Sequence, residues 1–522
     1  MPEHYSGNET ARNALLRQGA LLESEMAETK ALMEHTWVTL LEERRKLNSQ
    51  LNLLSPINQL PAEIKAEIFY NAVGDFYCLE GVNPLFLGKI CHCWRDVVWS
   101  TPILWTTLYL RLSRDNFKAQ TVLLRDWLSR AGKYPISFCL DTEEFLEMRP
   151  WLDHAPVQVL TLFASVSARW REIDIYFSDL QACVDIISRA KKTLPLLTTA
   201  AIQVLVSTGK QPNSLRLMAP QLSELHLHAN RSLGLLRKVL VAPWHQLREF
   251  FAEYCYRDEI RFFLHNAPHI VRCTFRAIES RYLEHSPAEE RHRPLLLEHL
   301  QYLELHFEVD DVFVETGWIF KGQVRLSSLR EFSLYNPAKN EPQDTVLLQI
   351  TDSFQSSPLL EKFTWSAMMM LDRDLIQALE NIPSVKDLDL NFLSYPPIKL
   401  LTKDFLQRLY FPHAENFLPN LRSFSYHGAT SLNEHMHLFR DMLAYRFRKC
   451  ALRASEADSG RTTVAQIKSV SMTSSSELVV SSDIQEELNS LVQAGLEFRL
   501  YFRTHLGPMK LLQTSNGVLV LE

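Results

Sequence analysis

The chain has 522 residues and a formal net charge of −6, and 46% of its residues are hydrophobic while 22% are charged. This composition is typical of a folded protein, and the length exceeds what one compact core accommodates, so we expect several domains. Lysine and arginine are scattered and do not outnumber the acidic residues, which argues against a nucleic-acid partner.

Residues 1–54 are predicted to form the first domain, an amphipathic helix. Apolar residues recur there at intervals of seven, as in a coiled coil: Met26, Met33, Leu40, Leu47 and Leu54. The second position of each heptad that a coiled coil requires to be apolar is instead polar: Thr29, Thr36, Glu43 and Gln50. Because Trp37, Leu41 and Leu51 instead widen the apolar stripe, we expect the helix to pack against its own chain. Weak self-association is the alternative.

Residues 55–110 are predicted to form a cluster of short helices. Pro61 stands where a helix begins, and Glu63 lies in its first turn, where the helix dipole favours an acid. Its apolar stripe consists of Leu60, Ile64, Ile68 and Phe69. A second helix ends at Thr101-Pro102 and has an apolar face of its own: Leu87, Ile90, Cys91, Trp94, Val97 and Val98. So short a segment is expected to leave apolar surface for a partner.

This segment resembles an F-box domain, more narrowly that of the F-box-like proteins expanded in mushroom-forming (agaricomycete) fungi. The matching residues are Leu60-Pro61-x-Glu63-Ile64, Ile68-Phe69, Ile90-Cys91-x-x-Trp94-Arg95 and Pro102-x-Leu104-Trp105. Lys65 departs from the family pattern, in which an apolar residue is usual there. The alternative interpretation is an ordinary helical hairpin of similar apolar content.

In that family the segment binds the adaptor subunit of a cullin–RING (SCF) ubiquitin ligase, and through the adaptor it reaches the cullin. The resemblance implies adaptor contacts at Leu60, Pro61, Ile64, Ile68 and Phe69. It also implies an F-box core that contains Ile90, Cys91, Trp94, Leu104 and Trp105.

Residues 111–522 carry a repeated L-x-x-L-x-L pattern, which predicts short strands with alternating inward side chains. Copies begin at Trp170, Leu197, Leu222, Ile270, Leu300, Leu329, Leu360, Val385 and Leu421, with a weak copy at Leu247. Their spacing of about 23–36 residues, and the prolines before several copies, are typical of irregular leucine-rich repeats. Amphipathic stretches at 371–380 and 434–448 are predicted return helices. A non-repetitive α/β domain is the alternative.

A solenoid of this kind places its strands on one concave wall, where an extended protein-binding surface forms. The residues between the inward positions are the candidates for target binding: His226, His228, Arg272, Arg276, Tyr302, Glu304, His306, Tyr335, Asp387, Asp389 and His427. Two more specific alternatives are a metal shared by the four histidines and catalysis by Asp387 and Asp389. The spacing of these residues in the sequence favours neither.

Three features near the carboxyl end complete the prediction. The basic patch Arg446–Lys449 is interpreted as a solvated helix end. Residues 467–472 are predicted to form a strand and residues 473–482 a mobile serine-rich loop. Asp483 is predicted to cap a helix that runs to about Ala494 and ends at Gly495.

No motif for catalysis, phosphate binding or a metal was found. With only 15 glycines the chain has no phosphate-cradling loop or nucleophile elbow, and Cys91-His92-Cys93 has no second pair of zinc ligands. The eight cysteines follow no disulfide framework. We find neither a signal-peptide pattern nor an apolar run long enough for a bilayer, and expect an intracellular protein, cytoplasmic or nuclear.

The expected fold class is therefore α+β with several domains: an amino-terminal helix, an all-α F-box cluster and an irregular leucine-rich-repeat (α/β solenoid) domain. The expected function is that of a non-enzymatic substrate receptor of an SCF-type ubiquitin ligase, with the adaptor and an unknown target protein as partners. No cofactor, nucleic acid or membrane is expected to bind. The alternative is a ligase-independent scaffold that uses an F-box-like fold.

Overall fold

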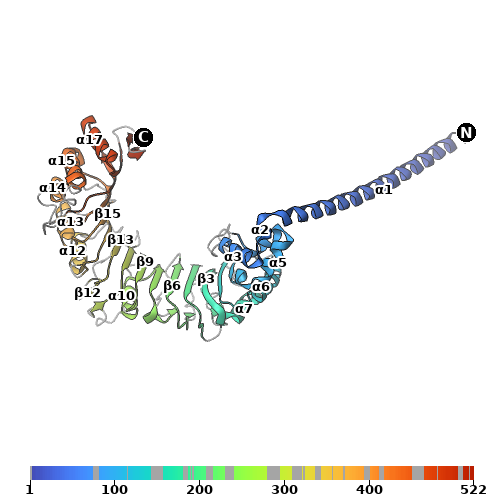
Figure 1. Cartoon of the computed structure of the whole chain (residues 1–522), viewed down its shortest axis with the longest axis horizontal. Coiled ribbons are helices and arrows are strands. Elements are labelled where there is room, and N and C mark those ends of the chain that lie inside the picture. Colours follow the sequence, from blue (N-terminus) through green and yellow to red (C-terminus); the bar gives the residue numbers. More distant parts are fainter. Residues whose placement is uncertain are drawn as a thin grey trace. The chain divides into compact units, whose positions relative to one another are not determined.

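The computed structural model (Figure 1) describes residues 3–73, 82–113, 116–142, 157–179, 186–187, 190, 193–206, 215–229, 240–278, 294–307, 320, 324–335, 343–354, 357–367, 371–392, 400–410, 417–449, 464–478, 480–503, 509–515 and 518–521. The chain divides into two compact units. Unit 1 comprises Met1–Tyr109 and Leu123–Tyr134, and unit 2 comprises Leu110–Val122 and Pro135–Glu522. The boundary crosses β1 (Thr107–Leu112) and α6 (Phe117–Arg130).

Helix α1 (Glu3–Leu54) is a single continuous helix of 52 residues, as predicted (Figure 1). None of its side chains that the structure describes is buried. Met33 is 69% exposed and Trp37 is 65% exposed. Within unit 1, the expectation that this helix packs against its own chain is therefore wrong for the described residues.

Four short helices and one 3-10 turn follow in unit 1: α2 (Pro56–Gln59), α3 (Ala62–Ala72), α4 (Pro84–Ile90), α5 (His92–Ser100) and η1 (Pro102–Trp105). Helix α3 begins directly after Pro61, as predicted. The second predicted helix is instead broken in two at Cys91, whose backbone is extended. The Cys91 Sγ atom accepts a hydrogen bond of 3.4 Å from the Trp94 amide and so caps α5.

The core of unit 1 is built on tryptophan. The Trp105 ring lies 5.3 Å from Trp99 and 4.8 Å from Trp127, and its Nε1 atom donates to the Val98 carbonyl at 2.8 Å. Leu104 and Trp105 are buried, as the resemblance implies, whereas Cys91 and Trp94 are half-buried.

Two residues of unit 1 depart from the expected pattern. Ile90 was expected in the core but is 47% exposed, because the break at Cys91 puts it out of phase with the face of α5. Lys65 is buried, and its Nζ atom lies 3.4 Å from both the Asn58 carbonyl and the Cys93 sulfur. A lysine that keeps hydrogen-bond partners thus occupies the position where the F-box pattern has an apolar residue.

Gly88 of α4 packs directly against Trp99. A Cβ atom at Gly88 would lie 2.0 Å from Trp99 Cζ3, and that ring is itself held between Trp105 and the Arg130 guanidinium. We expect Gly88→Ala to lower the free energy of unfolding of unit 1 by about 2–3 kcal/mol, although alanine is the better helix former. Urea unfolding followed by tryptophan fluorescence measures the change. Gly19→Ala is the control, since nothing lies within 4 Å of its Cβ position, and equal midpoints for the two variants would contradict the packing argument.

Unit 2 is built on a long sheet, to which the described strands contribute in the order β1-β2-β3-β4-β6-β8-β9-β11-β13-β14-β15-β16-β17-β18-β19-β20. Neighbouring strands from β2 to β18 are parallel, and β18, β19 and β20 pair antiparallel. The bounds are β2 (Ile136–Thr142), β3 (Trp170–Asp179), β4 (Thr199–Val206), β6 (Glu224–Ala229), β8 (Glu249–Glu253), β9 (Arg272–Ile278), β11 (Tyr302–Phe307), β13 (Glu331–Tyr335), β14 (Lys362–Ala367), β15 (Asp387–Phe392), β16 (Ser423–Gly428), β17 (Ser469–Glu477), β18 (Glu497–Arg503), β19 (Met509–Ser515) and β20 (Val518–Leu521).

The second half of every predicted L-x-x-L-x-L copy lies in one of these strands. The inward side chains of each copy are buried. The weak copy at Leu247 forms a full strand, β8, with Phe250 and Ala252 in the core. Short parallel pairs precede some copies: β5 (Leu215–Arg216) with β7 (Leu240–Val241), and β10 (Leu295–Leu296) with β12 (Val324–Arg325). The prediction of a repeated series of short strands is confirmed, and the structure shows that these strands are parallel.

Helices line one face of this sheet (Figure 1). They include α10 (Arg257–Asn266), α12 (Gln343–Ser353), α13 (Asp372–Glu380), α14 (Lys403–Leu409), α15 (Leu432–Ala444) and α17 (Ser482–Gln493), while α7 (Val157–Ser165) and the turns η2 (Ser167–Arg169) and η3 (Trp244–Gln246) lie earlier in the unit. The two predicted return helices are confirmed as α13 and α15. Aromatic side chains fill the space between the helices and the sheet, as where Phe332 lies 4.8 Å from Phe354.

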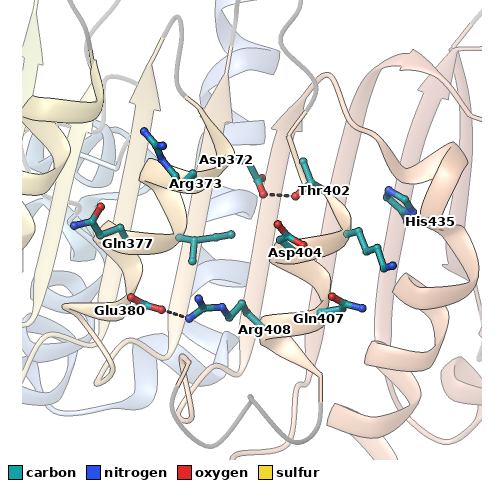
Figure 2. A pocket seen from close by; sticks show the side chains of 11 residues that line it. Asp372, Arg373, Gln377, Glu380, Thr402, Asp404, Gln407, Arg408 and His435 are labelled. Carbon is teal, nitrogen blue, oxygen red and sulfur yellow. Dashed lines mark hydrogen bonds and ion pairs between the residues drawn. The ribbon is translucent and has the colours of Figure 1, made fainter.

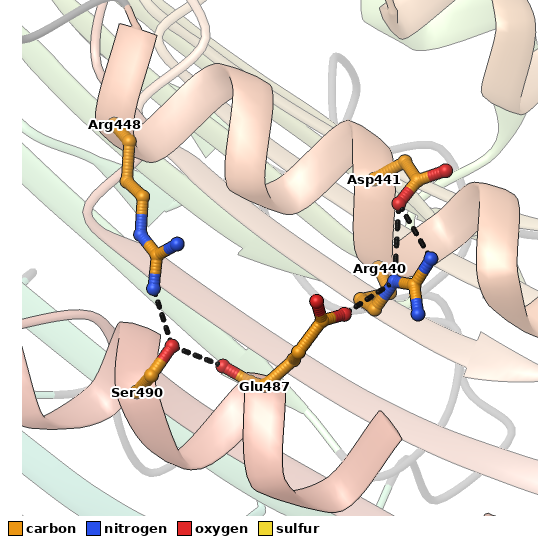
Figure 3. Close-up of polar contacts among 5 residues, drawn as sticks. All are labelled: Arg440, Asp441, Arg448, Glu487 and Ser490. Atoms are coloured by element: carbon orange, nitrogen blue, oxygen red, sulfur yellow. Dashed lines mark hydrogen bonds and ion pairs between the residues drawn. The ribbon is translucent and has the colours of Figure 1, made fainter. Parts of the chain in front are cut away.

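Side-chain contacts join neighbouring helices at the carboxyl end (Figure 3). Arg440 of α15 bonds its neighbour Asp441 and also Glu487 of α17, with 2.6 Å between Arg440 Nε and Glu487 Oε2. Arg448 follows in the turn η7 (Tyr445–Lys449) and donates to the Ser490 hydroxyl. These contacts tie α15 and the turn after it to α17.

Two predictions for residues 473–495 need correction. Strand β17 extends to Glu477, so residues 473–477 are strand rather than loop, because they pair with β18. Ser481, not Asp483, is the N-cap residue of α17, and Asp483 lies in its first turn. Gly495 follows the helix with φ of 107°, a left-handed conformation that suits glycine.

Arg446 is not at a solvated helix end, because it is only 1% exposed. Its guanidinium donates hydrogen bonds of 2.9 Å to the carbonyls of Leu409, Phe417 and Leu418. These carbonyls belong to the end of α14 and to the segment before β16. One buried arginine therefore holds three chain segments together.

Candidate protein-binding surfaces

The first candidate surface lies on the sheet face opposite the helices, across β6, β8, β9, β11 and β13. Outward side chains of these strands form a contiguous group, named the central patch: His226, His228, Glu249, Phe251, Glu253, Arg272, Arg276, Tyr302, Glu304, His306 and Tyr335. The strand register places Phe251 between His226 and Thr274, and Thr274 beside Glu304. Eight residues predicted from the sequence meet here, and the structure adds Glu249, Phe251 and Glu253.

Aromatic rings and arginines stack across the central patch. The Phe251 ring lies 4.4 Å from the His228 ring. The Arg276 guanidinium carbon lies 5.5 Å from the centroid of the Phe251 ring. The Arg272 guanidinium carbon lies 4.3 Å from the centroid of the Tyr302 ring. Tyrosine and arginine held in this way are the side chains that protein interfaces use most as anchors.

Acidic side chains of the patch lie beside histidines and an arginine of adjacent strands. The shortest nitrogen–oxygen distances are 3.6 Å for His226 and Glu249 and 3.4 Å for His228 and Glu253. Glu304 accepts hydrogen bonds from Tyr302 and from Arg276, the latter at 3.2 Å. Because Glu304 is only 9% exposed, it orients Tyr302 and Arg276 rather than offering its own carboxylate to a partner.

Burial controls the protonation of this surface. It lowers the pKa of His228, although Glu253 acts in the opposite direction. Burial and the Arg276 charge lower the pKa of His306, against the effect of Glu304. Burial also raises the pKa of Tyr302 and of Tyr335. At neutral pH the patch therefore presents neutral His228 and His306 and protonated Tyr302 and Tyr335 beside two arginines, a combination suited to binding a polypeptide.

The remaining predicted wall residues lie outside the central patch. Asp387 and Asp389 are on β15, separated from Tyr335 by β14, and His427 is on β16 beside Asn391. The four histidines named for a shared metal are therefore distributed over β6, β11 and β16. Within the described ranges, no group of three or more potential metal ligands occurs.

The second candidate surface is the apolar stripe of α3 in unit 1. Leu60 is 36% exposed, Ile64 is 44% exposed and Ile68 is 40% exposed, and Pro61 is exposed beside them. Phe69, expected at the same surface, is instead 1% exposed and its ring lies 4.6 Å from that of Trp94. It is out of helical phase with Ile64 and Ile68 and belongs to the core. The stripe that a partner can reach consists of Leu60, Pro61, Ile64 and Ile68.

A polar pocket of about 760 Å³ lies among the helices of unit 2 (Figure 2). Thr402 donates a hydrogen bond to Asp372, and Arg408 of α14 pairs with Glu380 of α13. Burial raises the pKa of Asp372, while hydrogen bonds from Thr402 and Leu401 oppose that rise. These contacts join α13 to α14, so the named charges already have partners within the chain.

No protein-family model matches the chain, and no curated protein matches its sequence. Among the helices that the structure describes, none has the length and apolarity needed to cross a membrane.

Proposed function

We propose that the chain is a substrate-recognition subunit of an SCF-type ubiquitin ligase. The stripe of α3 would bind the adaptor, and the central patch would bind a target protein. The observation that carries the proposal is the exposure of Leu60, just before Pro61, and of Ile64 and Ile68 on the short helix after it, the pattern on which the F-box resemblance rests. The parallel strands and return helices of unit 2 support the leucine-rich-repeat part of the same resemblance.

The proposed role requires no catalytic residue in this chain. A receptor that binds adaptor and target together raises the local concentration of target lysines near the ubiquitin-loaded enzyme. The stacked Arg272, Tyr302 and Phe251 are the proposed target anchors.

Co-expression with the SCF adaptor and cullin tests the adaptor half of the proposal. We expect the wild-type chain to co-purify with the adaptor and the double variant Leu60→Asp plus Ile64→Asp to lose it. Met218→Asp plus Leu296→Asp is the matched control, since these apolar residues of unit 2 are 55% and 52% exposed. A complex that never forms, or that survives the α3 changes, rejects the proposal. Circular dichroism of the α3 variant checks that the helices remain folded.

A ligase-independent scaffold with an F-box-like fold is the second candidate function. The burial of Phe69 favours it, because one of the expected adaptor contacts is committed to the core of unit 1. Absence of the adaptor complex, with cellular function retained in the Leu60→Asp plus Ile64→Asp variant, is the result this candidate predicts.

A further inference from the structure

Helix α1 carries an exposed apolar seam that no described part of unit 1 covers. Between Leu16 and Leu54 the seam positions alternate in steps of three and four residues, which aligns them along one side of the helix. They include Met26, Met33, Trp37, Leu40, Leu47 and Leu51, whose exposed fractions range from 55% to 71%. Helices in water depend on packing for most of their stability, so a seam of roughly 60 Å calls for a partner.

The charges of α1 indicate what that partner is. Three seam positions are charged: Glu23, Lys30 and Arg44. Two blocks of opposite sign lie toward the two ends of the seam. The acidic block is Glu23, Glu25 and Glu28, and the basic block is Arg44, Arg45 and Lys46, which Glu42 and Glu43 directly precede.

We propose that α1 pairs with α1 of a second copy of this chain in antiparallel orientation. One alignment uses the whole seam: Met33 lies beside Trp37 of the second copy, and Leu16 lies beside its Leu54. In this alignment Glu23 and Glu25 of each copy lie near Arg44, Arg45 and Lys46 of the other, whereas Glu28 lies level with Glu42. The two copies are thus complementary in charge where Glu23 and Glu25 meet the basic block.

The charged seam positions are also best accommodated in this orientation. Glu23, Lys30 and Arg44 lie beside Leu47, Leu40 and Met26 of the second copy. Their aliphatic stems cover the apolar neighbours while the charged ends reach water at the edge of the pair. In a parallel pair each of these residues would instead face its own counterpart, which places like charges together at three points of the seam.

Molar mass of the full chain, measured by light scattering after size exclusion, tests the pairing. We expect the wild-type chain to be a dimer at micromolar concentration. Reversing the acidic block (Glu23→Lys, Glu25→Lys and Glu28→Lys) should weaken the dimer at least about tenfold. Reversing the basic block in the same chain as well (Arg44→Glu, Arg45→Glu and Lys46→Glu) should restore it, since the blocks again complement each other. Circular dichroism confirms that each variant keeps its helix.

Carbodiimide cross-linking of the wild-type chain tests the orientation. The reagent joins a carboxylate directly to an amine, and we expect a peptide that links Glu25 to Lys46. Within one straight helix these residues are roughly 30 Å apart, so the link can form only between antiparallel copies. A monomer at every concentration, a dimer that is indifferent to reversal of the acidic block, or a cross-linked dimer without links between the blocks would overturn the proposal.

Discussion

Replacing Arg446 with methionine is expected to lower the free energy of unfolding of unit 2 by about 3–5 kcal/mol. The change removes a buried guanidinium that donates to the carbonyls of Leu409, Phe417 and Leu418, each at 2.9 Å. Three buried acceptors then lose a charged donor, and methionine supplies no replacement. Because the three carbonyls lie on two separate segments, we also expect the loss of contact between α14 and the segment before β16. Urea unfolding monitored by circular dichroism measures the difference.

Arg448→Met is the matched control for that experiment. Arg448 is exposed and donates to the Ser490 hydroxyl at the surface, so its removal should cost at most about 1 kcal/mol. The loss of unfolding free energy in Arg446→Lys should lie between those of Arg446→Met and Arg448→Met, since a single ammonium cannot reproduce the planar fork of the guanidinium. Equal losses for Arg446→Met and Arg448→Met would show that burial does not give Arg446 its role.

Replacing Asp174 with asparagine is expected to stabilise unit 2 at pH 8 by about 2–3 kcal/mol. Asp174 of β3 is only 4% exposed and lies opposite Cys139 of β2. Burial raises its pKa from 3.8 to about 6, although a hydrogen bond from the Cys139 thiol acts in the opposite direction. Above pH 6 the folded chain must therefore hold a buried carboxylate, and the isosteric amide removes that charge.

The pH dependence of this effect follows from the direction of the shift. The pKa of Asp174 is higher in the folded chain than in the unfolded one, so its cost is absent below pH 3.8 and complete above about pH 6. The gain from Asp174→Asn should accordingly be small at pH 4 and full at pH 8. Asp389→Asn on the half-exposed part of β15 is the control, with little expected change at either pH. A gain that is the same at both pH values would contradict the titration argument.

Much of the architecture was predictable because it depends on local periodicity. The L-x-x-L-x-L pattern located the strands, and the apolar spacing located α1, α13 and α15. The break between α4 and α5 was not predictable in the same way, because Cys91 interrupts a continuous apolar pattern through its thiol cap. Strand β17 is also longer than predicted, since its serines and threonines are held in the sheet by pairing with β18 rather than by their own strand propensity.

The binding surfaces were predictable in part for a related reason. Alternation along a strand identifies which residues point outward, and strand register then gathers them, as it does for Arg272, Tyr302 and His306. Phe251 was missed because its strand, β8, is formed by the weakest copy of the pattern. The burial of Phe69, Arg446 and Glu304 depends on contacts between distant segments, and no local pattern carries that information.

The order of the strands in unit 2 has a mechanical consequence. From β2 to β20 the strands of the long sheet pair in the order in which they follow one another in the chain, so few contacts bridge distant parts of the sheet. Each strand then draws its support from adjoining repeats. A molecule stretched from its ends would unzip in small successive steps, with a sawtooth of low force peaks, rather than rupture in a single event.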